Sequence, residues 1–137
     1  MRSVSFTVYG HPAPQGSSRA FVPKGWTRAI VTSTNPKLKP WRQEVAGAAK
    51  NLDLECLSKD AGVKIVCHFF FDRPASVSKK KRPYMTVKPD VDKLLRAILD
   101  SLKGILIQDD CQVIDARGRK FYGSPERVEI TVSEECE

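Results

Sequence analysis

Residues 88–104 read KPDVDKLLRAILDSLKG, and they predict an amphipathic helix more clearly than any other part of the chain. Pro89 favours an extended conformation for Lys88, so we expect the helix to start behind Asp90 as its N-cap and to end at Lys103-Gly104. Apolar residues follow the spacing i, i+3, i+4, i+7, i+8 and i+11 of one buried helix face; they are Val91, Leu94, Leu95, Ile98, Leu99 and Leu102.

The segments on either side of this helix predict four strands and a second helix. Residues 63–71 are β-branched and aromatic, with apolar residues on both faces, which is typical of a central strand. Further strands are expected at 3–9, 112–121 and 127–133, and a helix at 40–52. The order β-α-β-α-β-β predicts an α+β fold with a small mixed sheet and two main helices.

Length and composition favour one domain spanning residues 1–137. The chain has a mass of 15.3 kDa, with 41% hydrophobic and 28% charged residues, which is ordinary globular usage. No apolar run approaches the roughly 18 residues that a membrane-spanning helix needs, and residues 1–10 do not resemble a signal peptide. We therefore expect a cytoplasmic protein without membrane contact, and expect the cysteines at 56, 67, 111 and 136 to be free thiols.

Positive charge is concentrated in two loops. The net charge is +7, and all 16 acidic residues follow residue 43. The loops at 11–40 and 73–89 contain no acidic residue and are rich in proline and hydroxyl residues, which suits contact with a polyanion such as DNA. Trp26 could stack on an unpaired base, although a merely solvated basic surface is the alternative. The candidate DNA contacts are Arg19, Lys24, Arg28, Lys79, Lys80, Lys81, Arg82 and Lys88.

Two acidic pairs flank the 90–102 helix. Asp90 and Asp92 stand at its start, where helix capping alone would explain them, whereas Asp109 and Asp110 precede the next strand. We expect residues 105–108 to run back along the helix as an extended segment and to bring the second pair close to the first. Carboxylates without nearby histidine or cysteine favour Mg²⁺ or Mn²⁺, and such a site among basic loops suits phosphodiester hydrolysis.

The pattern Asp90-x-Asp92-Lys-Leu-x-Arg96-x-x-x-Asp100-x-Leu102, followed by Asp109-Asp110-x-Gln112-Val113, resembles the RusA family of Holliday-junction resolvases. The opening strand with Gly10-His11-Pro12-Ala13-Pro14-Gln15-Gly16, and the closing strand, are also similar to that family.

The resemblance implies a RusA-like fold, a metal site and a substrate. It implies that Asp90, Asp92 and Asp110 hold catalytic Mg²⁺, for which Mn²⁺ can substitute. Arg96 stands where the family usually has a catalytic lysine, and we interpret it as a phosphate clamp. The resemblance further implies a homodimer in bacterial or phage-infected cytoplasm that resolves four-way junctions by paired symmetric nicks in DNA recombination and repair.

Two other functions fit the same residues: a DNA-binding protein without catalysis, and a less selective nuclease acting on flaps or single strands.

Several further residues have ordinary explanations. We expect Asp100 to pair with Arg96, His68 to be a packing residue, and His11 to have no evident partner. Arg117, Arg119 and Lys120 either flank DNA or cover an exposed strand face.

Overall fold

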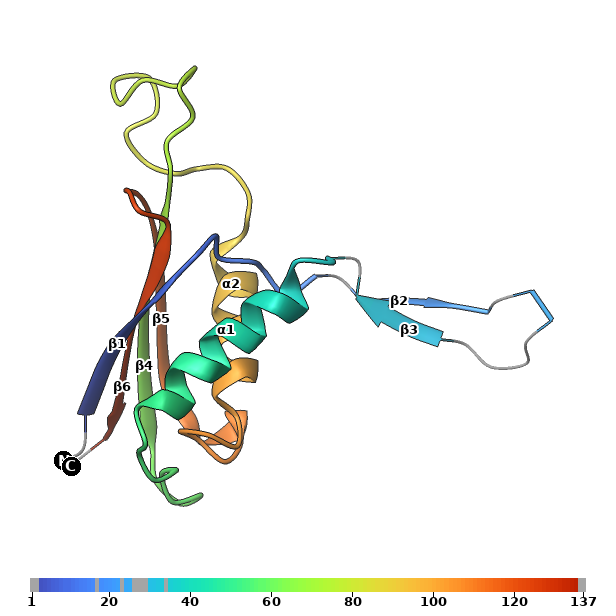
Figure 1. The fold of residues 1–137 in the computed structure, drawn as a ribbon, viewed down its shortest axis with the longest axis vertical. Coiled ribbons are helices and arrows are strands. Elements are labelled where there is room, and N and C mark those ends of the chain that lie inside the picture. The colour runs from blue at the N-terminus through green and yellow to red at the C-terminus, as the bar shows by residue number, and fades with distance from the viewer. Residues whose placement is uncertain (1–2, 17, 23, 26–29, 34, 136–137) are drawn as a thin grey trace.

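The computed structural model describes residues 3–16, 18–22, 24–25, 30–33 and 35–135. A four-stranded sheet in the order β1-β6-β4-β5 carries both helices on one face (Figure 1). Its strands are β1 (Ser3–Tyr9), β4 (Val63–Phe71), β5 (Val113–Tyr122) and β6 (Arg127–Glu134). The helices are α1 (Leu38–Asn51) and α2 (Val91–Leu102), and the short 3₁₀ turn η1 (Asp110–Gln112) precedes β5.

Strand β4 is central, as its sequence predicts. It pairs with β6 in antiparallel and with β5 in parallel orientation, so the sheet is mixed. Alternate β4 residues are buried beneath the helices, among them Ile65, Cys67 and Phe69. Burial raises the pKa of the Cys67 thiol to about 12, so this residue behaves as a small core side chain.

Helix α2 lies against both α1 and β5, and its apolar face forms much of the core. Leu94, Ile98 and Leu102 are completely buried, which confirms the helical spacing seen in the sequence. A side chain at Gly118 of β5 would place its Cβ 3.0 Å from Val91 Cγ2. The absence of a side chain there lets the first turn of α2 lie close to the strand.

The opposite face of the sheet has no helix over it and is closed by aromatic and arginine side chains. The rings of Phe70 and Phe121 stack at 5.0 Å, and the guanidinium of Arg127 lies 3.9 Å from the Phe70 ring. His68 packs edge-on against Phe121, which confirms its interpretation as a packing residue. Arg119 lies 5.0 Å over Phe121. The rings of Phe70 and Phe121 are thereby partly buried on this face.

A hairpin of β2 (Ser18–Phe21) and β3 (Ile30–Ser33) projects from the body beyond the start of α1 (Figure 1). The sequence indicates a long loop here with a short hairpin near 29–32. Helix α1 starts at Leu38, two residues earlier than predicted. Pro40 then occupies the first helical turn, where a missing amide proton leaves no hydrogen bond unmade.

The α+β class and the order of the main elements are therefore confirmed, with the hairpin and η1 added. Within the described part of the chain, no helix is long and apolar enough to cross a membrane. Cys56, Cys67 and Cys111 are free thiols as expected, and Cys136 lies outside the described residues.

Candidate active site

The amino end of α2 presents a carboxylate that does not cap the helix. Asp90 has the extended backbone of an N-cap residue, but its side chain makes no capping hydrogen bond. It forms a long ion pair with Lys93, whose Nζ lies 3.8 Å from Asp90 Oδ2, and half of the Asp90 side chain is exposed. Asp92 is exposed in the first helical turn. Both groups are therefore accessible to a cation or to solvent.

A buried glutamine positions the second acidic pair. Gln112 Oε1 accepts hydrogen bonds from the backbone amides of Gln108, at 2.7 Å, and of Asp109, at 3.1 Å. Its Nε2 donates to the carbonyls of Ser58, at 2.8 Å, and Ala61, at 3.1 Å. The segment that carries Asp109 and Asp110 is thereby fixed to the loop before β4. One signal of this role is visible in the sequence, a polar residue at the start of a predicted strand.

Asp110 lies in an environment that disfavours its charge. Burial raises the pKa of Asp110, and the neighbouring carboxyl groups of Asp100 and Asp109 raise it further, while Lys103 partly offsets them. Asp110 Oδ1 is buried and has no hydrogen-bond partner among the described residues. Asp100 and Asp110 can hydrogen-bond to each other only while one of them is protonated. A bound cation would supply a partner for Asp110 Oδ1 and would offset the repulsion between the two carboxylates.

The structure keeps two acidic sets apart within one chain. One consists of Asp90 and Asp92, and the other of Asp100, Asp109 and Asp110. Residues 103–107 form a tight turn closed by hydrogen bonds to the Leu102 carbonyl, so the extended segment predicted for 105–108 is wrong. Asp110 consequently lies beside Asp100, and the eight-residue step from Asp92 to Asp100 spans about 12 Å of helix at 1.5 Å per residue. No three acidic, histidine or cysteine side chains of the described residues form a metal-binding group.

Arg96 lies on the exposed side of α2, between the two acidic sets along the helix. The predicted ion pair with Asp100 is wrong, because no such contact exists among the described residues. The Asp100 side chain is half-buried, and its carboxyl group contacts that of Asp110 instead of the Arg96 guanidinium. The Arg96 guanidinium is therefore available to a ligand of opposite charge.

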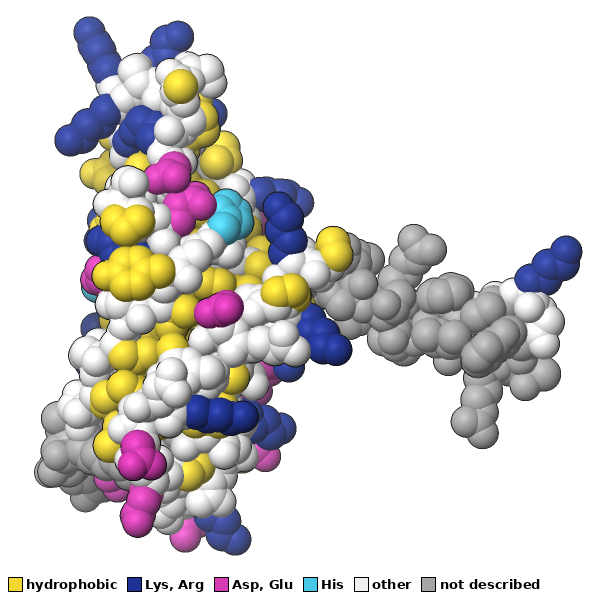
Figure 2. All heavy atoms as spheres, viewed as in Figure 1, with side chains coloured by type: hydrophobic (Ala, Val, Ile, Leu, Met, Phe, Trp, Pro, Cys, Tyr) yellow, Lys and Arg dark blue, Asp and Glu magenta, His cyan; other side chains and the backbone are white. Residues whose placement is uncertain are grey.

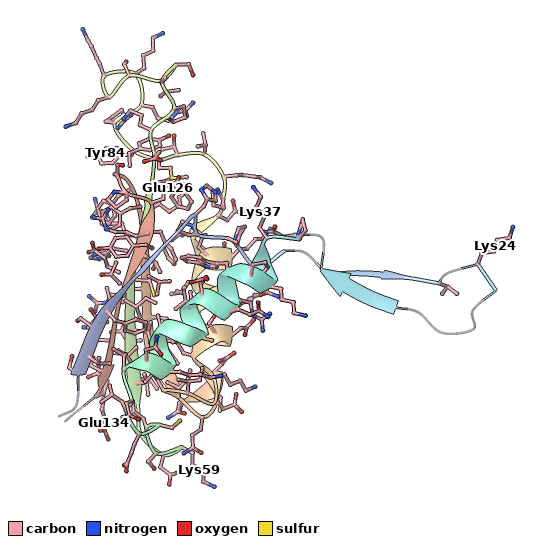
Figure 3. The ribbon with its side chains drawn as sticks, viewed as in Figure 1. Lys24, Lys37, Lys59, Tyr84, Glu126 and Glu134 are labelled. Atoms are coloured by element: carbon pink, nitrogen blue, oxygen red, sulfur yellow. The ribbon has the colours of Figure 1, made fainter. Side chains whose placement is uncertain are left out.

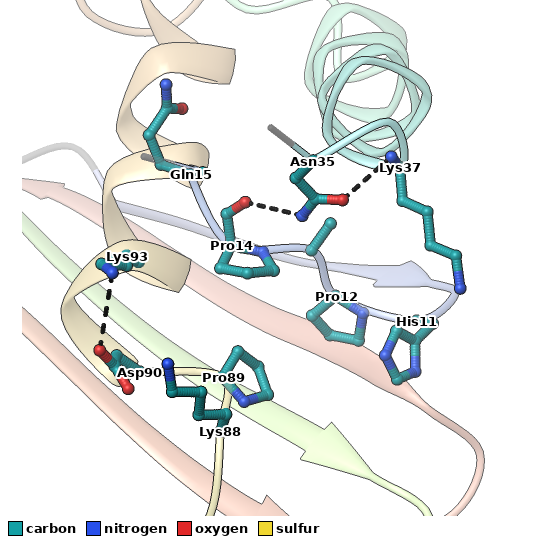
Figure 4. Close-up of a pocket in the computed structure, with 12 residues that line it drawn as sticks. His11, Pro12, Pro14, Gln15, Asn35, Lys37, Lys88, Pro89, Asp90 and Lys93 are labelled. Carbon is teal, nitrogen blue, oxygen red and sulfur yellow. Dashed lines mark hydrogen bonds and ion pairs between the residues drawn. The ribbon is translucent and has the colours of Figure 1, made fainter. Parts of the chain in front are cut away.

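A hollow of about 380 Å³ adjoins Asp90, and we call it the lysine hollow (Figure 4). Pro12, Pro14 and Pro89 contribute to its wall. Figure 4 shows Lys37 and His11 on one side of it, opposite Asp90 and the two lysines that flank it in sequence. The ionisable residues around it are His11, Lys37, Lys88, Asp90 and Lys93.

The basic loop between β4 and α2 is held at its base and exposed at its tip. Arg73 lies 4.2 Å from the Tyr122 ring and donates to the Arg82 carbonyl, and Arg82 donates to the Tyr122 hydroxyl at 3.3 Å. Lys79, Lys80 and Lys81 are exposed, as is Lys88. Figure 2 shows basic side chains gathered at this end of the molecule. Arg82 thus serves the fold, whereas the three lysines face solvent.

The remaining basic candidates divide between structure and surface. Lys120 donates to the carbonyls of Val87, at 2.6 Å, and Pro89, at 2.9 Å, so it supports the approach to α2. Arg117 pairs with Asp115 at 3.2 Å on the exposed sheet face. Lys24 is exposed near the tip of the hairpin (Figure 3). The side chain of Arg19, and Trp26 and Arg28 entirely, lie outside the described residues.

Comparison with known proteins identifies the family. Residues 11–133 match the family described as endodeoxyribonuclease RusA, which is most of the chain. The chain belongs to the RusA endodeoxyribonuclease family. RusA enzymes are endonucleases that resolve Holliday junctions, which agrees with the resemblance seen in the sequence. The chain is also 30% identical, over 98% of each sequence, to the uncharacterized protein YqaN of Bacillus subtilis (strain 168).

The environment of Asp110 predicts that Asp110→Asn stabilises the folded protein at neutral pH. A carboxyl group whose pKa is raised by folding lowers stability above that pKa, and the penalty vanishes below the unfolded value of about 3.9. Asp110→Asn removes the like charge and can donate to Asp100. We therefore expect the Asp110→Asn variant to have a higher unfolding free energy than wild type at pH 7, and the same value below roughly pH 3.9. The measurement is urea unfolding in the presence of a chelator.

The exposed Asp60→Asn serves as the control, and surface substitutions of this kind usually change stability by less than about 0.5 kcal/mol. A loss of stability in Asp110→Asn at pH 7 would contradict this description of the Asp100–Asp110 contact.

Proposed function

We propose that this chain is a divalent-metal-dependent endonuclease that acts as a homodimer and resolves four-way DNA junctions by paired symmetric nicks in recombination and repair. Asp90, Asp92 and Asp110 are the proposed metal ligands, and Arg96 is the proposed phosphate clamp. The observation that carries the proposal is the buried, unpartnered Asp110 oxygen beside the carboxyl groups of Asp100 and Asp109, in a member of this nuclease family.

The donor set fits a hard cation. All candidate ligands are carboxylate oxygens, which Mg²⁺ and Mn²⁺ prefer. Lys93 and Lys103 give Asp90 and Asp109 only long, exposed ion pairs of 3.8 Å and 3.6 Å. Such contacts contribute little and can be exchanged for a cation.

A second copy of the chain would complete the site. The two acidic sets lie at opposite ends of α2, so a two-fold axis perpendicular to this helix brings Asp90 and Asp92 of one chain towards Asp110 of the partner subunit. Strand β5 lies at the edge of the sheet beneath α2. Its outer edge offers backbone groups for antiparallel pairing of two copies. We propose this edge as the dimer surface.

The residues then have separate tasks. When bound, a divalent cation acts as a Lewis acid that lowers the pKa of a coordinated water and offsets charge on the phosphate. Arg96 has a planar, permanently charged guanidinium that suits two oxygens of one phosphate but is a poor proton donor at neutral pH. Lys79, Lys80, Lys81 and Lys88 would hold the DNA arms electrostatically, with affinity that decreases as salt increases.

Asp110→Asn tests whether the carboxylates are catalytic. We expect cleavage of a synthetic four-way junction in Mg²⁺ or Mn²⁺ to decrease roughly a thousandfold, since several kcal/mol of transition-state stabilisation is lost. Binding in a mobility-shift assay should be unchanged or tighter, because a negative charge near phosphate has been removed. A wild-type protein that binds junctions but never cuts them would instead establish a DNA-binding function without catalysis.

Mixed dimers test whether each site is shared between two chains. Asp92→Asn and Asp110→Asn chains carry different tags and are purified together as a heterodimer. In a shared arrangement both substitutions fall in one site and leave the other intact, so we expect the heterodimer to nick a cruciform plasmid to the open circle at about half the wild-type rate per dimer.

Each homodimer of a single variant should be inactive in the same assay. If the heterodimer is equally inactive while wild-type mixtures cut normally, each site is contained in one chain and the shared arrangement is wrong.

A further inference from the structure

The lysine hollow is built rigidly from segments far apart in the sequence. The His11 ring nitrogen lies 2.9 Å from Glu126 Oε1, and the amide of Asn35 donates to the Pro14 carbonyl at 3.1 Å. The Gln15 backbone amide donates to the Lys93 carbonyl at 2.9 Å, which attaches the 11–16 segment to α2.

The other wall is fixed by the two hydrogen bonds from Lys120 to the carbonyls of Val87 and Pro89. Both walls are therefore held without a ligand, so binding in the hollow would require little ordering of the chain.

Its lining combines two chemistries. The partly exposed rings of Pro14 and Pro89 give it apolar surface, whereas the lysines around it carry positive charge. Lys37 and Lys88 are exposed and form no ion pair among the described residues, while Lys93 is engaged only at 3.8 Å with Asp90. A ligand with a flat apolar part and an anionic part satisfies both chemistries.

The volume and position narrow the ligand class. The 380 Å³ of the hollow lies at the lower end of the roughly 300–1,000 Å³ range of small-molecule sites, which suits one nucleotide better than a stretch of duplex. Asp90, a proposed metal ligand, forms part of its lining. Enzymes that act on a distorted strand commonly hold an extruded base between apolar side chains.

We propose that the lysine hollow binds one unpaired nucleotide of the cut strand, adjacent to the cleaved phosphodiester. Its base lies against the partly exposed rings of Pro14 and Pro89, and its phosphate lies between Lys37 and Lys88. This inference rests on the proposed nuclease function, and it adds a nucleotide-binding site that includes Lys37, a residue outside the basic candidates considered above. Binding of this nucleotide requires the strand to open beside the cut, and a junction opens there more readily than an intact duplex.

The first experiment uses the free protein and does not depend on cleavage. Amide chemical shifts are followed during titration with deoxynucleoside 5′-monophosphates and, separately, with inorganic phosphate. We expect the nucleotide to shift Ala13, Gln15 and Lys88 at lower concentration than phosphate does. Lys37→Ala should weaken nucleotide binding roughly tenfold, the effect of losing one charged hydrogen bond, whereas Lys59→Ala at the far end of the molecule should not.

Equal responses to phosphate and nucleotide would overturn the proposal, because the hollow would then recognise the phosphate alone. Shifts confined to residues outside the hollow would overturn it as well.

The second experiment places 2-aminopurine next to the cleaved phosphate in a synthetic junction, with chelator present to prevent cutting. We expect protein binding to increase its fluorescence, since the base leaves the stack, and Lys37→Ala to lose most of this increase at saturating protein. Lys59→Ala is the control of equal charge. A bound junction with no increase would overturn the nucleotide site while leaving the nuclease proposal intact, and an unbound junction would overturn both.

Discussion

The packing of α2 against β5 and the core determines the geometry on which every functional feature depends. Leu94, Ile98 and Leu102 are completely buried, so the helix cannot shift along the sheet without exposing them. Its twelve residues then set a fixed distance between the carboxylates at its amino end and those at its carboxyl end. Because that distance cannot close within one chain, the separation of the acidic sets is a property of the core.

The sequence revealed the elements whose signals are local. Helix α2, strand β4 and strand β1 follow from side-chain periodicity, and the residues that carry the family resemblance are contiguous with them. The spatial relation of Asp110 to Asp90 could not be obtained in this way. It depends on a turn closed by hydrogen bonds to the Leu102 carbonyl, which side-chain periodicity does not reveal. It also depends on the anchoring of Gln112 to the Ser58–Ala61 turn, which is a contact between remote segments.

The roles of the basic residues could not be predicted either, because composition does not reveal which of them form hydrogen bonds within the fold and which remain exposed. Lys120, Arg73 and Arg82 belong to runs that look equally basic, yet they hold the loop between β4 and α2. Lys79–Lys81 remain exposed as a result. His11 has no partner visible in the sequence, but its contact with Glu126, 115 residues away, fixes one wall of the lysine hollow.

In the proposed dimer, a divalent ion lies between carboxylates of two chains. Anomalous scattering from a crystal soaked in Mn²⁺ measures this most directly, since the peak locates the ion independently of activity. We expect a peak bounded by Asp90 and Asp92 of one protomer and Asp110 of the partner subunit. A peak held by Asp100 and Asp110 of a single chain, or no peak near any of these residues, would contradict it.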